Sequence, residues 1–259
     1  VFLVARWAKR DGISTDIAYD VALWGILGGI IGARLMHVFD NTDYYFENPG
    51  KIFAVWQGGI GFLGAMIGGI LAGGIFAKIK NYPVGKIADY AAPAMAIAHI
   101  IGRIGDIWNG EHLSTPTDLP WGWVFSHPNS PGRIGAERLF NDPNIAVHPA
   151  VVYEMIWNAF TVLFLFKSRG KFKMDGSLWI IYMFMYSIGR FIIQFTRMDD
   201  VKFSIGNLGI QEAHIVTFSL FIITLILSIL FLRVKGNNSD NDQKIKKASG
   251  RKRKSQARA

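Results

Sequence analysis

The sequence contains no cysteine among its 259 residues. This absence excludes a disulfide framework, a cysteine nucleophile and a thiolate metal site. The chain also lacks the order of a signal peptide, in which charge precedes the apolar stretch, because here the apolar residues 1–5 come before Arg6, Lys9 and Arg10. We expect this opening segment to be the end of a helix whose beginning is missing.

Charged residues are scarce, at 18% of the chain, whereas 51% of the residues are hydrophobic and 14% are aromatic. The apolar residues form runs of about 20, the length that crosses the hydrocarbon core of a bilayer. This pattern predicts an all-α fold, a polytopic membrane helix bundle. We expect six spans to be present and a first span to be missing, the six lying at about residues 16–39, 52–77, 87–107, 148–166, 177–196 and 208–233.

Glycine is frequent inside the first two predicted spans. Small residues at helical spacing let membrane helices approach closely, so we expect most of these glycines to pack helix against helix. The run 57–61 is richer in glycine than packing requires. It predicts a broken or re-entrant segment, which must be buried in protein or line a wet cavity.

Lysine and arginine are unevenly divided between the loops. Of the 28, twenty fall in one set of alternating loops, five in the other set and three inside spans. This asymmetry predicts a cytoplasmic C-terminal tail and an outward-facing cap at about 108–147. We expect residues 1–235 to form one membrane domain in a bacterial inner membrane, and 236–259 to be a disordered basic tail.

The net charge of +9 does not by itself indicate a nucleic-acid partner. Much of it lies in residues 244–258, and a basic tail beside a membrane is attracted to anionic lipid headgroups. We therefore predict membrane lipids as partners and no nucleic acid. Because no pair of histidines has metal-site spacing, the sequence predicts no metal, and nothing in it indicates a cofactor.

Ionisable residues inside a membrane span are costly unless they are paired or wet, which makes them candidates for function. On a helix, His99, Arg103 and Asp106 share one face, at i, i+4 and i+7. The alternative is a structural Arg–Asp pair that joins two helices. Small and polar residues continue beside this face and toward the outer surface: Gly102, Gly105, Asn109 and Glu111.

A second polar group lies near the outer end of the span at 177–196. Arg190, Gln194 and Arg197 again stand at i, i+4 and i+7. Guanidinium forks match the oxygens of a phosphate. Arg103 and Arg190, on different helices near the same leaflet, therefore predict a phospholipid headgroup site. For Arg197, an interface arginine that snorkels to water is an open alternative.

A third polar group opens the span at 148–166. Pro149 suits the first turn of a helix, and it is followed by Tyr153 and Glu154. The carboxylate of Glu154 then lies one to two turns deep, where it needs a positive partner such as Arg103 or Arg190. A structural counter-charge and a direct chemical role both remain open for it.

Taken together, these residues resemble the prolipoprotein diacylglyceryl transferase family. Its signature runs Gly-Arg-x-Gly-Asn-Phe-x-Asn-x-Glu-x-x-Gly, and residues 102–114 match it at most positions. Further matches follow the family's order from about residue 6 to residue 235. They lie at 28–34, 48–49, 56–59, 89, 93, 116–122, 148–154 and 190–197.

The resemblance implies an enzyme that moves the diacylglyceryl group of phosphatidylglycerol to the lipobox cysteine of a prolipoprotein. A thioether forms, glycerol phosphate leaves, and the nucleophile comes from the substrate, which fits a chain without cysteine. The implied roles are phosphate binding for Arg103 and Arg190 and positioning of the headgroup or lipobox for Asn109 and Glu111. The other residues expected at the substrate site are Gln57, Gly58, Gly59, Gly102, Gly105, Tyr153, Glu154 and Arg197, with Tyr153 and Glu154 orienting the arginines.

The chain departs from the family pattern at several positions. Asp106 replaces the signature Asn, Ser114 the closing Gly and Gln194 an acid, and Leu63 stands where the family has a histidine regarded as a candidate base. From the resemblance, we expect the family's first helix to be missing upstream of the first residue. The candidates left to take the thiol proton are Asp106, Glu111 and His99.

Two other function classes remain to be distinguished. A phospholipid transporter or scramblase could use the same arginine pocket without covalent chemistry, but transporters often show repeated halves, and this sequence shows none. A structural membrane subunit would leave the charges inside the spans unexplained. Label transfer from phosphatidylglycerol to a lipobox peptide would separate these classes.

Overall fold

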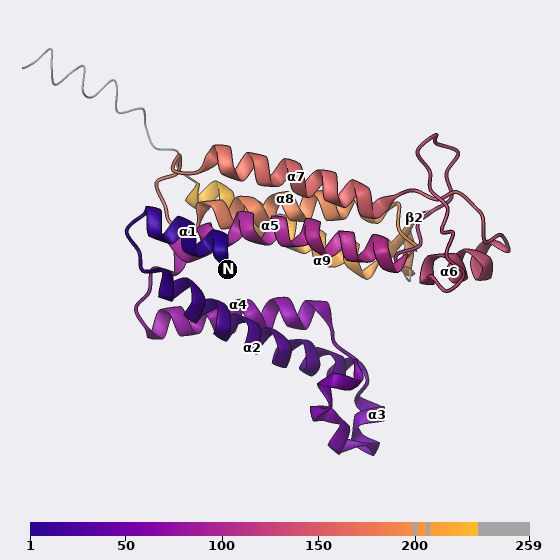
Figure 1. Cartoon of the computed structure of the whole chain (residues 1–259), viewed down its shortest axis with the longest axis horizontal. Helices are drawn as coiled ribbons and strands as arrows, with labels where there is room; N and C mark the ends of the chain where they lie inside the picture. Colours follow the sequence, from indigo (N-terminus) through magenta and orange to yellow (C-terminus); the bar gives the residue numbers. More distant parts are fainter. Residues whose placement is uncertain (199–200, 206–207, 233–259) are drawn as a thin grey trace, which may run out of the picture.

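The structure is a computed structural model, and it describes residues 1–198, 201–205 and 208–232. Within these residues it is mainly helical, apart from connecting segments, the longest at 110–130, and one small hairpin, which confirms the all-α prediction (Figure 1). The α-helices are α1 (Phe2–Arg10), α2 (Thr15–Asp40), α3 (Thr42–Glu47), α4 (Phe62–Ile79), α5 (Val84–Asn109), α6 (Pro131–Phe140), α7 (Ala150–Ser168), α8 (Ser177–Gln194) and α9 (Glu212–Phe231).

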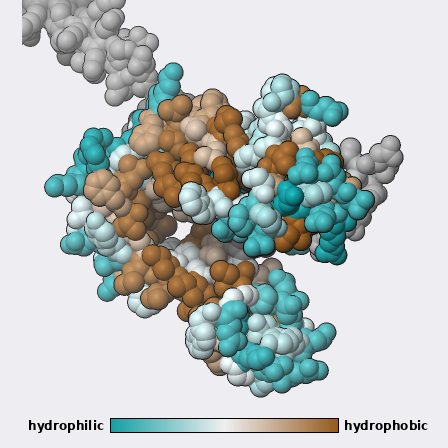
Figure 2. Space-filling view, turned by 45° about the vertical axis from the view of Figure 1, so that its right-hand side comes forward, coloured by the Kyte–Doolittle hydropathy of each residue, from teal (hydrophilic) through white to brown (hydrophobic). Residues whose placement is uncertain are grey.

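Four long helices, α5, α7, α8 and α9, run side by side, and α2 pairs with α4 as a separate hairpin (Figure 1). By length and composition, α2, α7, α8 and α9 can each cross a membrane. Large apolar side chains lie exposed along the middle of the helices and polar ones gather toward their ends (Figure 2). Such an exposed apolar band is typical of a surface that faces lipid. The chain is a multi-pass membrane protein.

Two predicted spans differ from the helices in the structure. Helix α4 begins at Phe62, ten residues later than the predicted span 52–77. The chain before it forms the 3-10 helices η1 (Pro49–Phe53) and η2 (Val55–Gln57), followed by Gly58 and Gly59 with positive φ. The prediction of a helix over 52–61 was therefore wrong, while the prediction of a broken segment there is confirmed.

The last predicted span also begins differently. Residues 208–211 form strand β2 (Leu208–Gln211), which pairs antiparallel with β1 (Val201–Ile205), and α9 starts at Glu212. The change from strand to helix occurs at Gln211, because Gln211 and His214 form a capping box that fixes the start of α9. The basic tail at 236–259 lies outside the described residues, so its predicted disorder stays a prediction.

Glycines bring α2 and α4 into close contact. A Cβ at Gly32 would collide with the carbonyl oxygen of Gly64, and one at Gly64 with that of Gly32; Gly28 and Gly68 face each other in the same way. The two backbones can pass this closely only without side chains. The predicted packing role is confirmed for these glycines.

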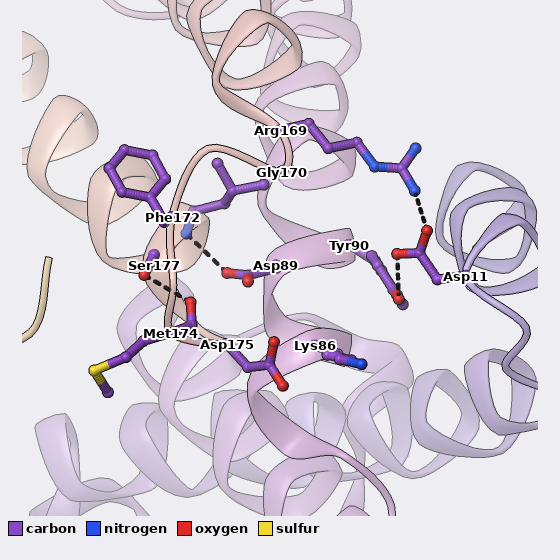
Figure 3. A pocket seen from close by; sticks show the side chains of 11 residues that line it. Asp11, Lys86, Asp89, Tyr90, Arg169, Gly170, Phe172, Met174, Asp175 and Ser177 are labelled. Atoms are coloured by element: carbon purple, nitrogen blue, oxygen red, sulfur yellow. Dashed lines mark hydrogen bonds and ion pairs between the residues drawn. The ribbon is translucent and has the colours of Figure 1, made fainter. Parts of the chain in front are cut away.

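Carboxylates hold together the end of the bundle at which α5 and α8 begin and α7 ends (Figure 3). Asp89 of α5 accepts hydrogen bonds from the backbone N–H groups of Gly176, Leu178 and Trp179, and so caps the start of α8. Asp11 accepts hydrogen bonds from Tyr90 and Arg169, which ties the end of α1 to α5 and to the turn after α7. These contacts set the axial register of α5, α7 and α8, the helices that carry the polar residues at the other end.

Candidate active site

Arg103, near the C-terminal end of α5, contacts two carboxylates. Its Nη1 lies 2.5 Å from Asp106 Oδ2, one turn further along α5, and its Nη2 lies 2.5 Å from Glu154 Oε2 on α7. An Arg–Asp pair is therefore present, but it lies within α5 and does not join two helices, as the sequence-based alternative required. It is not isolated, because Glu154 joins Arg103 to a larger cluster.

Glu154 is the centre of that cluster. Its side chain is 7% exposed, and its other oxygen, Oε1, lies 2.5 Å from Arg190 Nη1 and 3.4 Å from Arg197 Nη1. Three guanidinium groups from three parts of the chain thus meet at one buried carboxylate. We call Arg103, Arg190, Arg197, Glu154, Asp106 and His112 the arginine cluster.

Packing between α7 and α8 positions Arg190. The indole of Trp157, one turn after Glu154, lies where a Cβ on Gly189 would be, and its Nε1 donates a hydrogen bond to the carbonyl of Met185 at 2.8 Å. Gly189 therefore lets the ring sit directly against the α8 backbone. This contact holds the next residue, Arg190, opposite Glu154.

Backbone pairing positions Arg197. Just after α8, Thr196 accepts a hydrogen bond from Thr115 N at 2.9 Å, and Met198 N donates one to Leu113 at 3.1 Å, so that Arg197 stands opposite Ser114 in an antiparallel bridge. The Arg197 side chain is 4% exposed. It is not a snorkelling interface arginine but a buried member of the cluster.

His112, on the cap segment beside this bridge, completes the cluster. Its Nδ1 lies 2.6 Å from Arg197 Nη2, and its Nε2 lies 3.3 Å from Arg103 Nη1 and 3.4 Å from Asp106 Oδ2. Its backbone is left-handed, with φ +65°, a conformation that costs an L-residue roughly 1–2 kcal/mol. Burial, with the positive charges of Arg197 and Arg103, lowers the pKa of His112 below its usual value, although Asp106 and Glu111 oppose this.

Sequence reasoning missed His112. Its position directly after Glu111 was the only available signal, since its partner Arg197 lies 85 residues further along the chain. The left-handed backbone and the pairing across the bridge, neither of which has a local sequence signature, bring the two side chains together.

The other predicted residues at the end of α5 and just after it lie at the edge of the cluster. Asn109 donates a hydrogen bond to Glu111 Oε1 at 3.0 Å, and Glu111 lies close to Asp106 and His112. Apart from the backbone of α5 itself and the adjoining residues, no heavy atom of the described residues lies within 4 Å of a Cβ built at Gly102 or Gly105. The face beside Arg103 is therefore open.

Tyr153 does not contact the arginines through its hydroxyl group. That group accepts a hydrogen bond from Trp121 Nε1 at 2.8 Å and lies 3.3 Å from His148 Nδ1. Tyr153 thus joins the start of α7 to the cap. It can orient the arginines only indirectly, through the helix turn that also carries Glu154.

The residues Gln57, Gly58 and Gly59 lie on the turn before α4, around Arg34. The Arg34 side chain donates hydrogen bonds to four backbone carbonyls, those of Lys51, Ile52, Gly58 and Gly59. In the part of the chain that the structure describes, no hydrogen bond of this turn reaches the arginine cluster. Arg34 therefore shapes the turn, and the structure does not join it to the other predicted site residues.

The other proton-acceptor candidates occupy different surroundings. His99 lies one turn before Arg103, beside the rings of Tyr182 and Tyr186, with its Nδ1 3.4 Å from the Tyr182 hydroxyl group. Leu63 lies in the first turn of α4 and offers no titratable group. The remaining candidates, Asp106 and Glu111, are carboxylates that lie close to His112.

Asp106, Glu111 and His112 could in principle share a metal ion, since one ligand atom of each lies within 4.8 Å of the others. However, Arg103 and Arg197 already contact Asp106 and His112 at 2.5 and 2.6 Å. Two guanidinium charges at those distances oppose a divalent cation. The prediction of no metal stands as a prediction.

The chain is similar to known proteins over most of its length. The family model described as prolipoprotein diacylglyceryl transferase matches residues 1–230. A relative from Trichormus variabilis is 36% identical over 211 residues, covering 79% of this chain and 72% of its own. One from Clostridioides difficile is 34% identical over 243 residues, covering 93% and 88%. Both carry the name phosphatidylglycerol–prolipoprotein diacylglyceryl transferase.

Proposed function

The chain belongs to the prolipoprotein diacylglyceryl transferase family, and we propose that its arginine cluster binds the phosphate of phosphatidylglycerol during transfer to a prolipoprotein. The protein is a transferase, and the resemblance found in the sequence is confirmed. The single observation that carries the proposal is the meeting of Arg103, Arg190 and Arg197 at the carboxylate of Glu154. The comparisons do not favour the transporter or scramblase alternative.

The cluster suits a phosphate because its donors are charged, preorganised and mostly buried. Guanidinium groups in a site of low dielectric stabilise negative charge that develops on a leaving group far better than water does. The open face beside Gly102 and Gly105 gives the lipid's glycerol backbone a place next to Arg103. In this arrangement the phosphate approaches Arg103 and Arg190 while Glu154 keeps the three arginines together.

The reaction is a displacement at carbon. The thiolate of the prolipoprotein cysteine attacks the glycerol carbon that bears the phosphate, a C–S bond forms, and the C–O bond to phosphate breaks. The electron pair leaves with glycerol phosphate, whose added negative charge the arginines stabilise. The thiol proton goes to Asp106, Glu111 or His99, and the positive field of the arginines lowers the cost of forming the thiolate.

The test uses membranes that contain the full chain, phosphatidylglycerol labelled in its acyl chains, and a peptide with a lipobox cysteine. We expect label on the cysteine and one glycerol phosphate released per peptide modified. A matched peptide with serine in place of the cysteine should stay unlabelled. Movement of labelled lipid between leaflets without label on the peptide would support the scramblase alternative and reject the transferase.

The proposed orientation follows from the charge asymmetry between the two ends. The cap and the start of α4 lie at one end of the molecule, and the basic turns 78–86 and 167–173 lie at the other (Figure 1). We expect the cap to face the outside of a bacterial inner membrane and the tail to be cytoplasmic. A membrane-impermeant thiol reagent should label Ser130→Cys and spare Ser249→Cys; the reverse pattern would overturn this orientation.

A further inference from the structure

His112 is the one titratable member of the arginine cluster that lies outside the helices and that the reaction described above does not use. Its left-handed backbone turns its side chain toward Arg197, Arg103 and Asp106. Strained backbone that the surrounding structure maintains is often found where a side chain must be held for function. The segment is held here by the bridge between Ser114 and Arg197.

The contacts decide which nitrogen of His112 carries the hydrogen. Arginine only donates hydrogen bonds, and a neutral imidazole has one acceptor nitrogen. The Arg197 contact at Nδ1 is 2.6 Å, whereas the Arg103 contact at Nε2 is 3.3 Å. Nδ1 is therefore the acceptor, and Nε2 carries the hydrogen, for which Asp106 Oδ2 at 3.4 Å is the available acceptor.

With this assignment five side chains form a closed ring. Arg103 contacts Glu154, Glu154 contacts Arg197, Arg197 contacts His112, His112 faces Asp106, and Asp106 contacts Arg103. His112 is the one neutral link between two cations and two carboxylates. Replacing it by a cation would put a donor against the Arg197 donor and open the ring.

We propose that His112, as a neutral imidazole, is a positioning residue of the transfer site, closing this ring so that Arg103 and Arg197 are held for the phosphate. The proposal rests on the proposed function. It does not make His112 the proton acceptor, because its one acceptor nitrogen is already occupied by Arg197.

The proposal has a consequence for pH. The charged groups that face His112 are Arg103 and Asp106 from α5, Arg197 from the segment after α8, and Glu111 beside it. Burial and the two arginines lower the pKa of His112, so it stays neutral at and above the ordinary histidine range near 6.5. Transfer should therefore hold above that range and fall as acid protonates His112.

Two substitutions separate positioning from other roles. Asn tolerates a left-handed backbone, and its Oδ1 can accept a hydrogen bond from Arg197 in place of His112 Nδ1. H112N should therefore keep transfer within about threefold of the parent at pH 7.5. Because an amide does not titrate, the fall in transfer at acid pH that comes from protonation of His112 should disappear. H112G relieves the backbone and removes the acceptor, so it should be at least as heat-stable as the parent. Its transfer should fall about 10- to 100-fold, the usual effect of a misplaced catalytic group.

Asn141 offers a matched control, since it also has a left-handed backbone (φ +54°), ends α6 and, among the described residues, makes no hydrogen bond to the cluster. N141G should match H112G in heat stability and keep full transfer. Full transfer by H112G, or its loss together with heat stability, would overturn the proposal. Equal loss in H112N and H112G would overturn it in favour of a proton acceptor, since an amide cannot take that proton.

The tautomer of His112 can be measured without turnover, so this proposal can be tested separately from the proposed function. Nitrogen-15 spectra of the histidine-labelled protein, with His112 assigned by its absence in H112N, should show hydrogen on Nε2 and none on Nδ1 at pH 7. Hydrogen on Nδ1 would overturn the ring. The predicted tautomer in a parent chain that transfers nothing would leave the ring standing and reject the proposed function.

Discussion

The α2–α4 hairpin and the bundle of α5, α7 and α8 use glycine and arginine in different ways. In the hairpin, Gly32 lies against the Gly64 backbone, and Arg34 donates to four backbone carbonyls. In the bundle, a Cβ at Gly102 would meet nothing within 4 Å, and the arginines share side-chain partners. Backbone acceptors are fixed by the fold, whereas carboxylates can rotate. We therefore expect an incoming anion to take donors from the cluster but not from Arg34.

We expect the largest effect, a loss of stability, when the negative charge of Glu154 is removed from the cluster. Glu154→Gln leaves three guanidinium groups without their shared carboxylate, and breaking a buried ion pair from one side costs about 3–5 kcal/mol. We expect a lower melting temperature in detergent and less inserted protein. Glu137→Gln, on the cap helix α6, is the matched control and should behave like the parent. Parental stability of Glu154→Gln would remove Glu154 from the centre of the cluster.

The next largest effect concerns the phosphate-binding arginines. Arg103→Lys keeps the charge but loses the planar fork, and Arg190→Ala loses both. Each should lower transfer by about 100-fold or more, the usual effect of removing one preorganised donor. Inserted protein, measured by blotting of membranes, should stay near the parental amount. Near-normal transfer by either variant would exclude that arginine from the phosphate site.

Substitution of a hairpin glycine should act on stability. Gly32→Ala forces α2 and α4 apart, and overpacking of this kind costs about 1–3 kcal/mol. Its melting temperature should fall. Stability equal to that of the parent would show that the close approach of the two helices contributes little.

The open glycine of α5 should respond in the opposite direction. Gly102→Ala meets no neighbour and should stabilise the helix by roughly 0.5–1 kcal/mol. The added methyl group would nevertheless occupy the space proposed for the lipid, so the KM for phosphatidylglycerol should rise severalfold. An unchanged KM would show that the lipid does not use this face.

The smallest effect is expected at Leu63, on the hairpin side of the comparison. If the arginine field alone lowers the cost of forming the thiolate, Leu63→His should neither raise the rate nor shift its pH profile. A large gain with a new ionisation near pH 6.5 would show that a base matters at that position.

The sequence predicted the members of the cluster better than their connections. Arg103, Arg190 and Glu154 could be identified because an ionisable side chain in a membrane span needs a partner. His112 could not, because its role depends on a left-handed backbone and on a bridge to a distant segment. The break before α4 was foreseen from its glycines, but Arg34, whose carbonyl partners are distant in sequence, could not be recognised as the residue that shapes that turn.

Lipid binding, measured without turnover, tests the contrast between an arginine held by carboxylates, such as Arg103, and one held by backbone carbonyls. Native mass spectrometry of the purified protein with phosphatidylglycerol should show binding at least about tenfold weaker for Arg103→Lys, a loss of about 1.4 kcal/mol. Arg133→Lys is the control, because Arg133 donates to the backbone carbonyls of Phe125 and Pro143, and it should bind like the parent. Equal binding by the parent and both variants, or equal loss in both variants, would contradict the claim that the cluster holds the phosphate.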